Sequence, residues 1–350
     1  MALSRRTADI RDVAKKAGVS VGTVSRVVNG HPSVTMAKRQ LVQSAIAELK
    51  YRPDAFAQSL RKRTSNTIGV IIPDIRNPFF AELMQCIEIR ARALGYSVLF
   101  VSSDEDPAAE TEHIEAFAAR KVDGILLLPS NTATSAPHID GVPIVVVDRP
   151  IKGHPAVAAD NRGGARLGVE YLVSLGHRRI ACIAGPKDSI TAKSRLAGFL
   201  DVMTSHYRTA RLRIADYVAY GDFDYAGGQS AADALLGGPA LRPTAIVAGS
   251  DQQAIGALRA AADRCIGVPS DLSVVGFDGI LLSDLVTPRL TTVVQPAAKI
   301  AEAAVALVLR AGPMSASNAP NLLECELVVR DSCAPPPAAA VRPSILRQKG

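Results

Sequence analysis

From residue 66 onward, short apolar segments alternate with longer stretches that have helical periodicity. Apolar runs of four to six residues, separated by helical links long enough for crossovers, are typical of a parallel α/β fold. The two kinds of segment fall into two similar groups, roughly 66–160 and 161–291, as if one structural plan were used twice. The predicted strands are 67–72, 97–101, 124–128, 144–147, 180–184, 245–248 and 272–277, and the clearest predicted helices are 80–94, 163–175 and 252–265.

The positive charge of the chain is concentrated near its N-terminus. Residues 1–63 hold 13 Lys and Arg against 4 Asp and Glu, whereas the rest of the 350 residues holds 27 bases and 29 acids. The net charge of +7 therefore divides into a +9 segment and a −2 body. Such asymmetry indicates a polyanion-binding head joined to a body with a different role.

The basic head carries the pattern of three short helices. Apolar residues recur at helical spacing in each of them, Asp9 and Ser20 can cap the first two, and Gly18 can end the first. Only three residues separate the first helix from the second, which is the turn length of a helix-turn-helix motif. The predicted helices are 10–17, 21–28 and 35–50.

The second helix of such a motif enters the major groove of DNA with its N-terminal residues at the base edges. Arg26 has the reach for two hydrogen bonds to a guanine, and Asn29 can contact a base edge or a phosphate. Helix N-termini can place amides and hydroxyls against phosphate oxygens. The candidate DNA-binding residues of the head are Ser20, Val21, Gly22, Thr23, Ser25, Arg26, Asn29 and Thr35.

Three segments of the head, DIRDVAKKAGVS from Asp9, TVSRVVN from Thr23 and AELKYRP from Ala47, resemble the LacI/GalR family of bacterial transcription regulators. The similarity continues to about Ser332. It implies a sequence-specific repressor that binds a near-palindromic operator as a dimer and responds to a small effector. It also implies that 53–60 is a hinge helix that folds on DNA, with Leu60 as the wedge in the minor groove. Eight residues are too few for a stable isolated helix, so folding would be coupled to binding.

The resemblance further implies an all-α head with a hinge helix, followed by a two-subdomain α/β effector domain like that of periplasmic sugar-binding proteins. The Pro/Ala-rich, basic segment at the end of the chain is predicted to be a disordered tail. The expected parts are the head 1–52, the hinge 53–64, the effector domain 65–334 and the tail 335–350. Within the effector domain, the N-subdomain is expected at about 65–161 and 293–325, and the C-subdomain at about 162–292 and 326–334.

Carboxylates, arginines and phenylalanines follow the predicted strands in both halves of the body. In open parallel sheets, ligands bind beyond the carboxyl ends of the strands. Asp and Arg side chains can bind neighbouring hydroxyls, and a phenyl ring can lie against a sugar ring, so the set suits a sugar or another polyol. By position in the family, the implied effector-binding residues are Phe79, Asp148, Arg149, Thr191, Arg195, Phe223, Asp251 and Asp278.

Two other functions stay open beside the regulator: a sugar-processing enzyme and a sugar-binding module of transport, each carrying a DNA-binding head. The common nucleotide-binding, metalloprotease and hydrolase motifs are missing from the sequence, and the six histidines lack metal-ligand spacing. His177 follows a predicted helix and is interpreted as its C-terminal cap. We therefore expect neither an enzyme nor a bound metal or cofactor.

The compartment and the partners follow from the same features. The sequence shows no secretory signal and no apolar run of about 20 residues, and its five cysteines form no C-x-x-C motif. We expect a cytoplasmic protein without membrane contact. Its expected partners are double-stranded operator DNA, a sugar-like effector and a second copy of the chain. The choice between dimer and tetramer stays open, as does the sign of the response to the effector.

Overall fold

The computed structural model describes residues 8–29, 31–51, 64–132, 135–210, 212–238, 242–310 and 319–337. The chain divides into two compact units, Met1–Ser65 and Asn66–Gly350, called here the head and the body. The predicted hinge helix 53–60, including Leu60, and residues 338–350 of the predicted tail lie outside the described residues.

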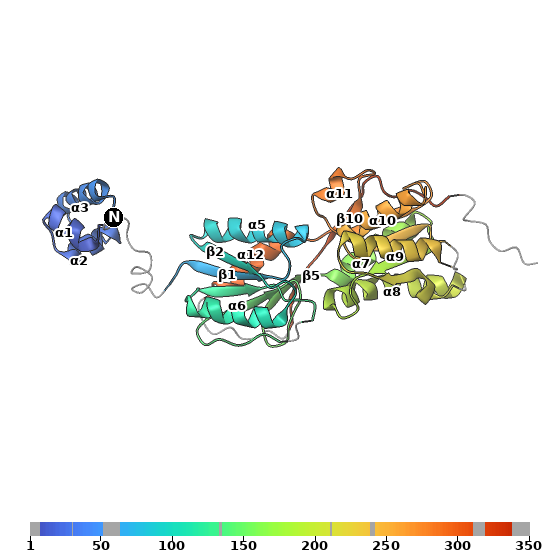
Figure 1. The fold of residues 1–350 in the computed structure, drawn as a ribbon, viewed down its shortest axis with the longest axis horizontal. Coiled ribbons are helices and arrows are strands. Elements are labelled where there is room, and N and C mark those ends of the chain that lie inside the picture. The colour runs from blue at the N-terminus through green and yellow to red at the C-terminus, as the bar shows by residue number, and fades with distance from the viewer. Residues whose placement is uncertain are drawn as a thin grey trace, which may run out of the picture. The chain divides into compact units, whose positions relative to one another are not determined.

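The head contains α1 (Ile10–Ala17), α2 (Val21–Val28) and α3 (Met36–Leu49), as predicted (Figure 1). Asp9 caps α1 through the backbone N–H groups of residues 11 and 12, and Gly18 ends it at φ +64°. The Ser20 hydroxyl accepts a hydrogen bond from the Thr23 N–H at 3.2 Å and so caps α2. Thr35 precedes α3 without a side-chain capping bond. The three-residue turn is thus closed by local hydrogen bonds that the sequence encodes directly.

The three short helices of the head are held together by a small apolar core. Each helix contributes a fully buried valine to one hydrophobic cluster: Val13 from α1, Val24 from α2 and Val42 from α3. Helices of eight residues are marginal alone in water, so this packing supplies most of their stability.

The first subdomain of the body is a parallel sheet with the strand order β11-β5-β4-β3-β1-β2. Ile68 and Val70 of β1 belong to the core beneath α5 and α12, whereas Ile71 packs on the opposite face with residues of α6. The three helices lie on the two faces in this way in Figure 1. The elements are β1 (Thr67–Ile72), α5 (Pro78–Ala93), β2 (Ser97–Ser102), α6 (Pro107–Ala119), β3 (Gly124–Leu127), β4 (Ile144–Val147), β5 (Ala156–Ala159), α12 (Ala297–Val308) and β11 (Asn321–Leu323).

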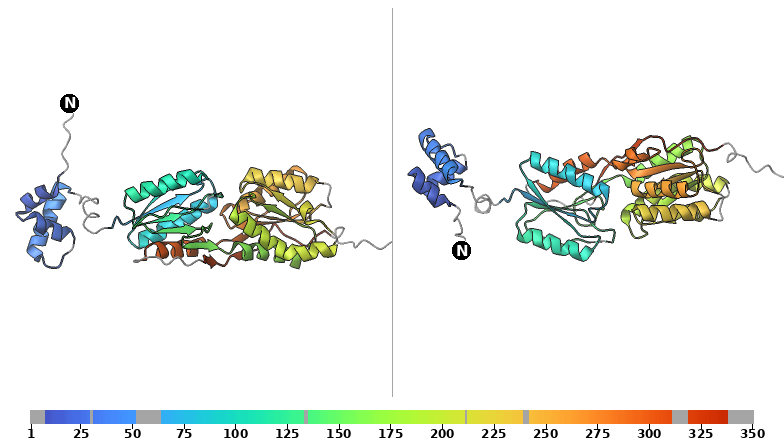
Figure 2. Two further views of the ribbon diagram at one scale, coloured as in Figure 1. Left: turned by 90° about the horizontal axis from the view of Figure 1, so that it is seen from below. Right: turned by 45° about the horizontal axis from the view of Figure 1, so that its top comes forward.

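The second subdomain repeats the plan with the strand order β12-β10-β9-β8-β6-β7, in which β12 runs antiparallel to β10. Figure 2 shows α7 and α8 on one side of this sheet and α9 and α10 on the other. The elements are α7 (Asn161–Ser174), β6 (Ile180–Ala184), α8 (Ile190–Ala210), a 3-10 helix (Ile214–Tyr217), β7 (Val218–Tyr220), α9 (Tyr225–Gly237), β8 (Ala245–Ala248), α10 (Asp251–Asp263), β9 (Ser273–Asp278), α11 (Leu282–Leu285), β10 (Thr291–Val294) and β12 (Glu326–Val328).

In its described part, the chain passes between the two subdomains at Asp160, at 295–296 and at 324–325. The second passage lies beyond the expected boundary between 292 and 293, because β10 pairs with β9 as far as Val294. Likewise Asn161 begins α7 and so opens the second subdomain. Among the described residues, no helix is both long and apolar enough to cross a membrane.

Candidate DNA-binding head and effector site

Most of the candidate DNA-binding residues lie on the outside of the head. Val21 and Gly22, at the start of α2, are exposed, and so are Arg26 and Asn29 near its end. Ser20 and Thr35 are exposed at the N-termini of α2 and α3, while Thr23 is half-buried with its hydroxyl 3.0 Å from that of Ser20. These candidates therefore present small side chains, the Arg26 side chain and two helix N-termini to the surroundings of the head.

Ser25 differs from the other candidates because it points into the head. It is 8% exposed, and its backbone carbonyl accepts a hydrogen bond from the Asn29 side-chain amide at 2.8 Å. Asn29 thus closes the last turn of α2 as well as facing outward. Helical periodicity places Ser25 beside Val24 on the border of the buried face, where sequence alone does not decide the direction.

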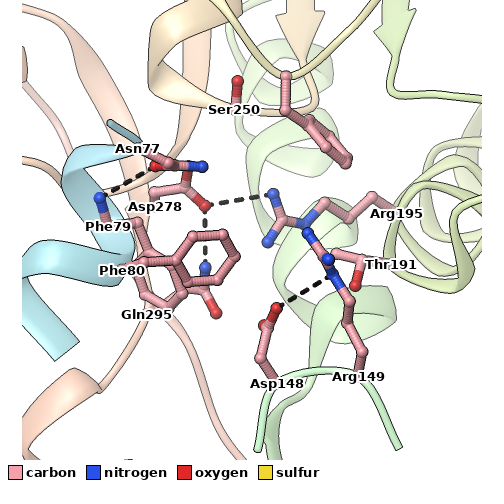
Figure 3. A pocket seen from close by; sticks show the side chains of 11 residues that line it. Asn77, Phe79, Phe80, Asp148, Arg149, Thr191, Arg195, Ser250, Asp278 and Gln295 are labelled. Carbon is pink, nitrogen blue, oxygen red and sulfur yellow. Dashed lines mark hydrogen bonds and ion pairs between the residues drawn. The ribbon is translucent and has the colours of Figure 1, made fainter. Parts of the chain in front are cut away.

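A pocket in the body lies where the strand ends of the two subdomains meet (Figure 3). About 270 Å³ of space lies between its lining atoms, part of it open to solvent. Seven of the eight predicted effector-binding residues line it, and four residues that were not predicted join them. The lining residues are Asn77, Phe79, Phe80, Asp148, Arg149, Thr191, Arg195, Phe223, Ser250, Asp278 and Gln295.

Two phenyl rings enter the pocket from the first turn of α5. The Asn77 side chain caps this helix by accepting a hydrogen bond from the Phe79 N–H at 3.0 Å, and Pro78 occupies its first position. The cap fixes the helix start, so Phe79 and Phe80 follow at once, both nearly buried with ring centroids 5.6 Å apart. The pocket thereby gains an apolar wall from a sequence-local motif.

Asp148 and Arg149 follow β4 as a buried pair of opposite charges. Arg149 Nε lies 3.6 Å from Asp148 Oδ2, and Arg149 Nη1 donates to the Pro129 carbonyl at 2.6 Å and to Glu105 at 3.2 Å. Burial raises the pKa of Asp148, and the nearby Arg149 guanidinium partly offsets this rise. Asp148 has φ +71°, a conformation that non-glycine residues adopt rarely and often at binding sites.

Arg195 and Asp278 form the corresponding pair of the second subdomain. Arg195 Nη1 lies 3.2 Å from Asp278 Oδ1, which also accepts a hydrogen bond from Gln295 Nε2 at 2.8 Å (Figure 3). The Arg195 guanidinium stacks 3.7 Å from the Phe277 ring. Burial raises the pKa of Asp278 to about 6, although Arg195 opposes this change. Asp278 has φ +119° and so is held in an unusual backbone conformation.

Several polar atoms of the pocket are buried and have no hydrogen-bond partner within the part of the chain that the structure describes. They include Asp148 Oδ1, Thr191 Oγ1 and Gln295 Oε1. Buried polar atoms in proteins are nearly always paired, so these are positions where a ligand can donate or accept hydrogen bonds. The two arginines and two aspartates balance in charge, which favours a neutral ligand rich in hydroxyl groups over an anion.

Asp251 was predicted as an effector contact but is not among the lining residues. It is fully buried, and Oδ2 of its carboxylate accepts hydrogen bonds from the Gly279 and Ile280 N–H groups at 2.8 and 2.9 Å. Thr292 Oγ1 lies 2.5 Å from its other oxygen. Burial raises the pKa of Asp251 to about 8, and the charge of Asp278 adds to this rise. Asp251 therefore fixes the turn that follows Asp278.

The four additional lining residues differ in how well the sequence pattern could have predicted them. Phe80 and Ser250 directly adjoin predicted residues, and Asn77 lies two positions before Phe79, so the strand-end pattern includes all three. Gln295 follows β10, which was not among the predicted strands. No sequence pattern distinguishes Gln295 from other glutamines.

His177 lies fully buried, away from the lining residues of the pocket. Its ring bonds to Thr244 Oγ1 at 2.9 Å and to the Ala334 carbonyl at 2.9 Å, rather than to the carbonyls of the preceding helix. Burial lowers its pKa. Within the described ranges, no cluster of three or more His, Cys, Asp or Glu side chains could hold a metal ion.

Comparison with known proteins covers both units. Residues 9–54 match the family of bacterial regulatory proteins of the lacI type, and residues 169–333 match the periplasmic binding protein-like domain. The chain is 40% identical over 290 residues to the ribose operon repressor of Halalkalibacterium halodurans, covering 82% of this chain and 85% of that protein. It is 36% identical over 331 residues to the HTH-type transcriptional repressor CytR of Escherichia coli K12, covering 93% and 96%.

A solved structure resembles the whole chain as well. The lac repressor dimer bound to operator and the anti-inducer ONPF superposes with a TM-score of 0.81 at 30% identity, covering 94% of this chain and 100% of that one. The helix-turn-helix of the head, the two sheets of the body and the sequence identity all point to the same family. The chain belongs to the LacI family of bacterial transcription regulators.

Proposed function

We propose that this protein represses transcription as a homodimer on a near-palindromic operator, and that a pentose such as D-ribose in the body pocket changes its operator affinity. The protein would act in the cytoplasm, where its DNA is. The observation that carries the effector class is the charge-balanced pocket whose buried polar atoms lack partners.

The aromatic side of the pocket supports a ligand with a ring. Phe79 and Phe80 provide the apolar wall against which a furanose or pyranose ring can lie.

The polar atoms of the pocket match the hydroxyl groups of a sugar. Each hydroxyl both donates and accepts, and the open atoms are acceptors at Asp148 and Gln295 and a hydroxyl at Thr191. Arg149 and Arg195 also line the pocket and can donate hydrogen bonds to a sugar. The ribose operon repressor named among the relatives is consistent with a pentose effector.

The head supports dimeric operator binding. Each α2 can enter one major groove, and two-fold symmetric pairs of such helices read near-palindromic sites. The exposed residues Val21, Gly22 and Arg26 are those we propose for base contacts, and Ser20, Thr35 and Asn29 for phosphate or base contacts. The similar lac repressor structure is a dimer on operator DNA.

Isothermal titration calorimetry of the full chain tests the effector class. D-ribose, D-xylose, D-arabinose and D-ribose 5-phosphate are titrated separately into the protein and into the Asp278→Asn variant. We expect D-ribose to bind more tightly than the other sugars, in line with the ribose operon repressor among the relatives. The phosphate ester should bind worst, because the pocket has no surplus of positive charge. Preferred binding of the phosphate ester, or no binding of any pentose, would refute the proposed effector.

A fluorescence anisotropy assay with labelled operator then tests regulation. Saturating D-ribose should shift the operator affinity, and a ligand without differential affinity for the two conformational states cannot do so. NMR spectra of D-ribose incubated with the protein should stay unchanged over hours. Steady conversion of the sugar would instead favour the sugar-processing enzyme.

A further inference from the structure

Asn161 lies at the first passage of the chain between the two subdomains. It follows Ala159, the last residue of β5 in the first sheet, by two positions, and it is the first residue of α7 in the second subdomain. It is 7% exposed. Asn161 is not a lining residue of the pocket, yet its side chain is hydrogen-bonded at both ends.

The two bonds of Asn161 connect different parts of the molecule. Its Oδ1 accepts a hydrogen bond from Arg195 Nε at 2.7 Å, and its Nδ2 donates to the Ala159 carbonyl at 3.2 Å. Arg195 belongs to α8 and lines the pocket, whereas Ala159 ends a strand of the other subdomain. One amide group therefore joins a pocket arginine to the passage.

The helix that Asn161 begins does not need this side chain. Asp160 is the N-terminal cap of α7, and its carboxylate accepts a hydrogen bond from the Gly163 N–H at 2.9 Å. The strand end is also held independently, because the Asp160 N–H donates to the Leu323 carbonyl at 2.8 Å. Local structure is thus satisfied without Asn161, and the partners described for its buried amide are Arg195 and Ala159.

Arg195 depends on this amide for its orientation. Among the described residues, the guanidinium has four other polar or aromatic neighbours: the Gly249 carbonyl, Asp278 Oδ1 and the rings of Phe277 and Phe223. The carbonyl and the carboxylate both bind at Nη1, so Asn161 is the acceptor described for Nε. A planar guanidinium fixed at Nε and at Nη1 has its remaining edge set in direction.

We propose that Asn161 is a positioning residue that sets the Arg195 guanidinium in the effector pocket and ties it to the first passage between the subdomains. A ligand that shifts the Arg195 guanidinium would shift the Asn161 amide through their hydrogen bond, and with it the end of β5. The inference rests on the proposed effector function of the pocket. It adds a residue outside the pocket that couples effector binding to the subdomain arrangement.

Two substitutions separate the two bonds. Asn161→Asp keeps an acceptor for Arg195 Nε and removes the donor to the Ala159 carbonyl. Asn161→Ala removes both. Asn321→Ala is the matched control, since Asn321 is an exposed residue of β11 and loses the same amide. Each full-length variant is titrated with D-ribose by calorimetry, and its operator affinity is measured with and without D-ribose.

We expect Asn161→Ala to weaken D-ribose binding by more than about tenfold relative to Asn321→Ala, because a buried hydrogen bond to a charged group is lost. Asn161→Asp should stay within about tenfold of the wild type in D-ribose affinity, yet show a smaller D-ribose effect on operator affinity. A purely structural role would not separate these two readouts. Wild-type D-ribose affinity in Asn161→Ala, or a wild-type operator response in Asn161→Asp, would overturn the proposal.

A ligand-free measurement keeps this test separate from the effector proposal. If the wild type binds no pentose, the proposed effector fails, and hydrogen–deuterium exchange of the peptide 156–165 decides about Asn161. Faster exchange of this peptide in both Asn161 variants than in Asn321→Ala supports the proposed link between Asn161 and the end of β5. Equal exchange in all three variants overturns it.

Discussion

Replacing Arg195 with alanine should unfold the body at a markedly lower temperature. The side chain is 7% exposed and makes polar contacts with Asn161, with the Gly249 carbonyl and with Asp278. Its removal leaves three buried acceptors without this donor and a buried carboxylate without its cation. The stacking of the guanidinium on the Phe277 ring is lost as well.

The magnitude follows mainly from the carboxylate. Breaking a buried ion pair by removing one partner costs about 3–5 kcal/mol. Asp278 limits this loss by taking up a proton. Its pKa is already about 6, so at pH 7 a further rise costs ~1.4 kcal/mol per unit only until the neutral form predominates. We therefore expect about 3 kcal/mol of lost stability at pH 7. For a domain of this size, the melting temperature should fall by roughly 5–10 °C.

A double-mutant cycle tests whether the buried charge is the cause. The melting temperatures and denaturant midpoints of Arg195→Ala, Asp278→Asn and the double variant are compared with the wild type at pH 7. If the unpaired carboxylate causes the loss, Asp278→Asn should restore at least about 1 kcal/mol in the Arg195→Ala background. Arg195→Lys serves as a control that keeps the charge and loses the planar fork.

Two results would refute this reasoning. One is a melting temperature of Arg195→Ala within about 2 °C of the wild type. The other is strict additivity of the two substitutions, which would show that Arg195 and Asp278 do not stabilise one another in the folded protein.

Three further predictions concern pH, an interior carboxylate and the head. D-ribose affinity should fall as the pH drops through about 6, because protonated Asp278 no longer accepts hydrogen bonds from Arg195 and the sugar as a carboxylate; calorimetry from pH 8 to 5 that gives a flat profile would contradict this. The pKa of Asp251 is about 8 in the folded protein against a usual 3.8, so its contribution to the free energy of unfolding falls as the pH rises from about 4 to about 8. Asp251→Asn should therefore retain the melting temperature at pH 7, whereas Asp251→Ala should lose about 3 kcal/mol because the Gly279 and Ile280 N–H groups lose their acceptor; equal melting temperatures of the two variants would exclude this role. Arg26→Ala should weaken operator binding by about 1–3 kcal/mol and leave random DNA less affected, as measured by anisotropy with both DNAs; equal losses on both would make Arg26 a phosphate contact.

The head was predicted almost completely because its structure depends on near neighbours in sequence. Asp9, Gly18 and Ser20 act within three residues of their own positions, and the valines recur at helical spacing. Most of the strands of the body were predicted for the same reason, since β1 and β4 are unbroken runs of β-branched residues or nearly so. The strand β5 was missed because its sequence AVAA carries neither a period nor strong β propensity.

The effector residues were implied by the family resemblance and agree with a place after strands, but neither argument separates Asp251 from Asp278. Asp251 follows β8 just as Asp278 ends β9, yet one carboxylate turns to the backbone of a neighbouring turn and the other faces the pocket. Gln295 was missed for the converse reason, because its role arises from Asp278, which lies 17 positions earlier in the chain. Which way a side chain turns depends on neighbours that the local sequence does not specify.

The sequence by itself determined the division of this protein into a +9 head and a −2 body, the helix-turn-helix and the alternation of strands and helices, because charge, capping and periodicity are properties of short segments. Only the tertiary structure decided which of the many strand-end side chains meet in one pocket. It also placed the Asn161 amide between Arg195 and Ala159. These contacts join residues that are brought together by two sheets and three passages of the chain, and their directions are fixed by burial and by the hydrogen bonds of distant partners.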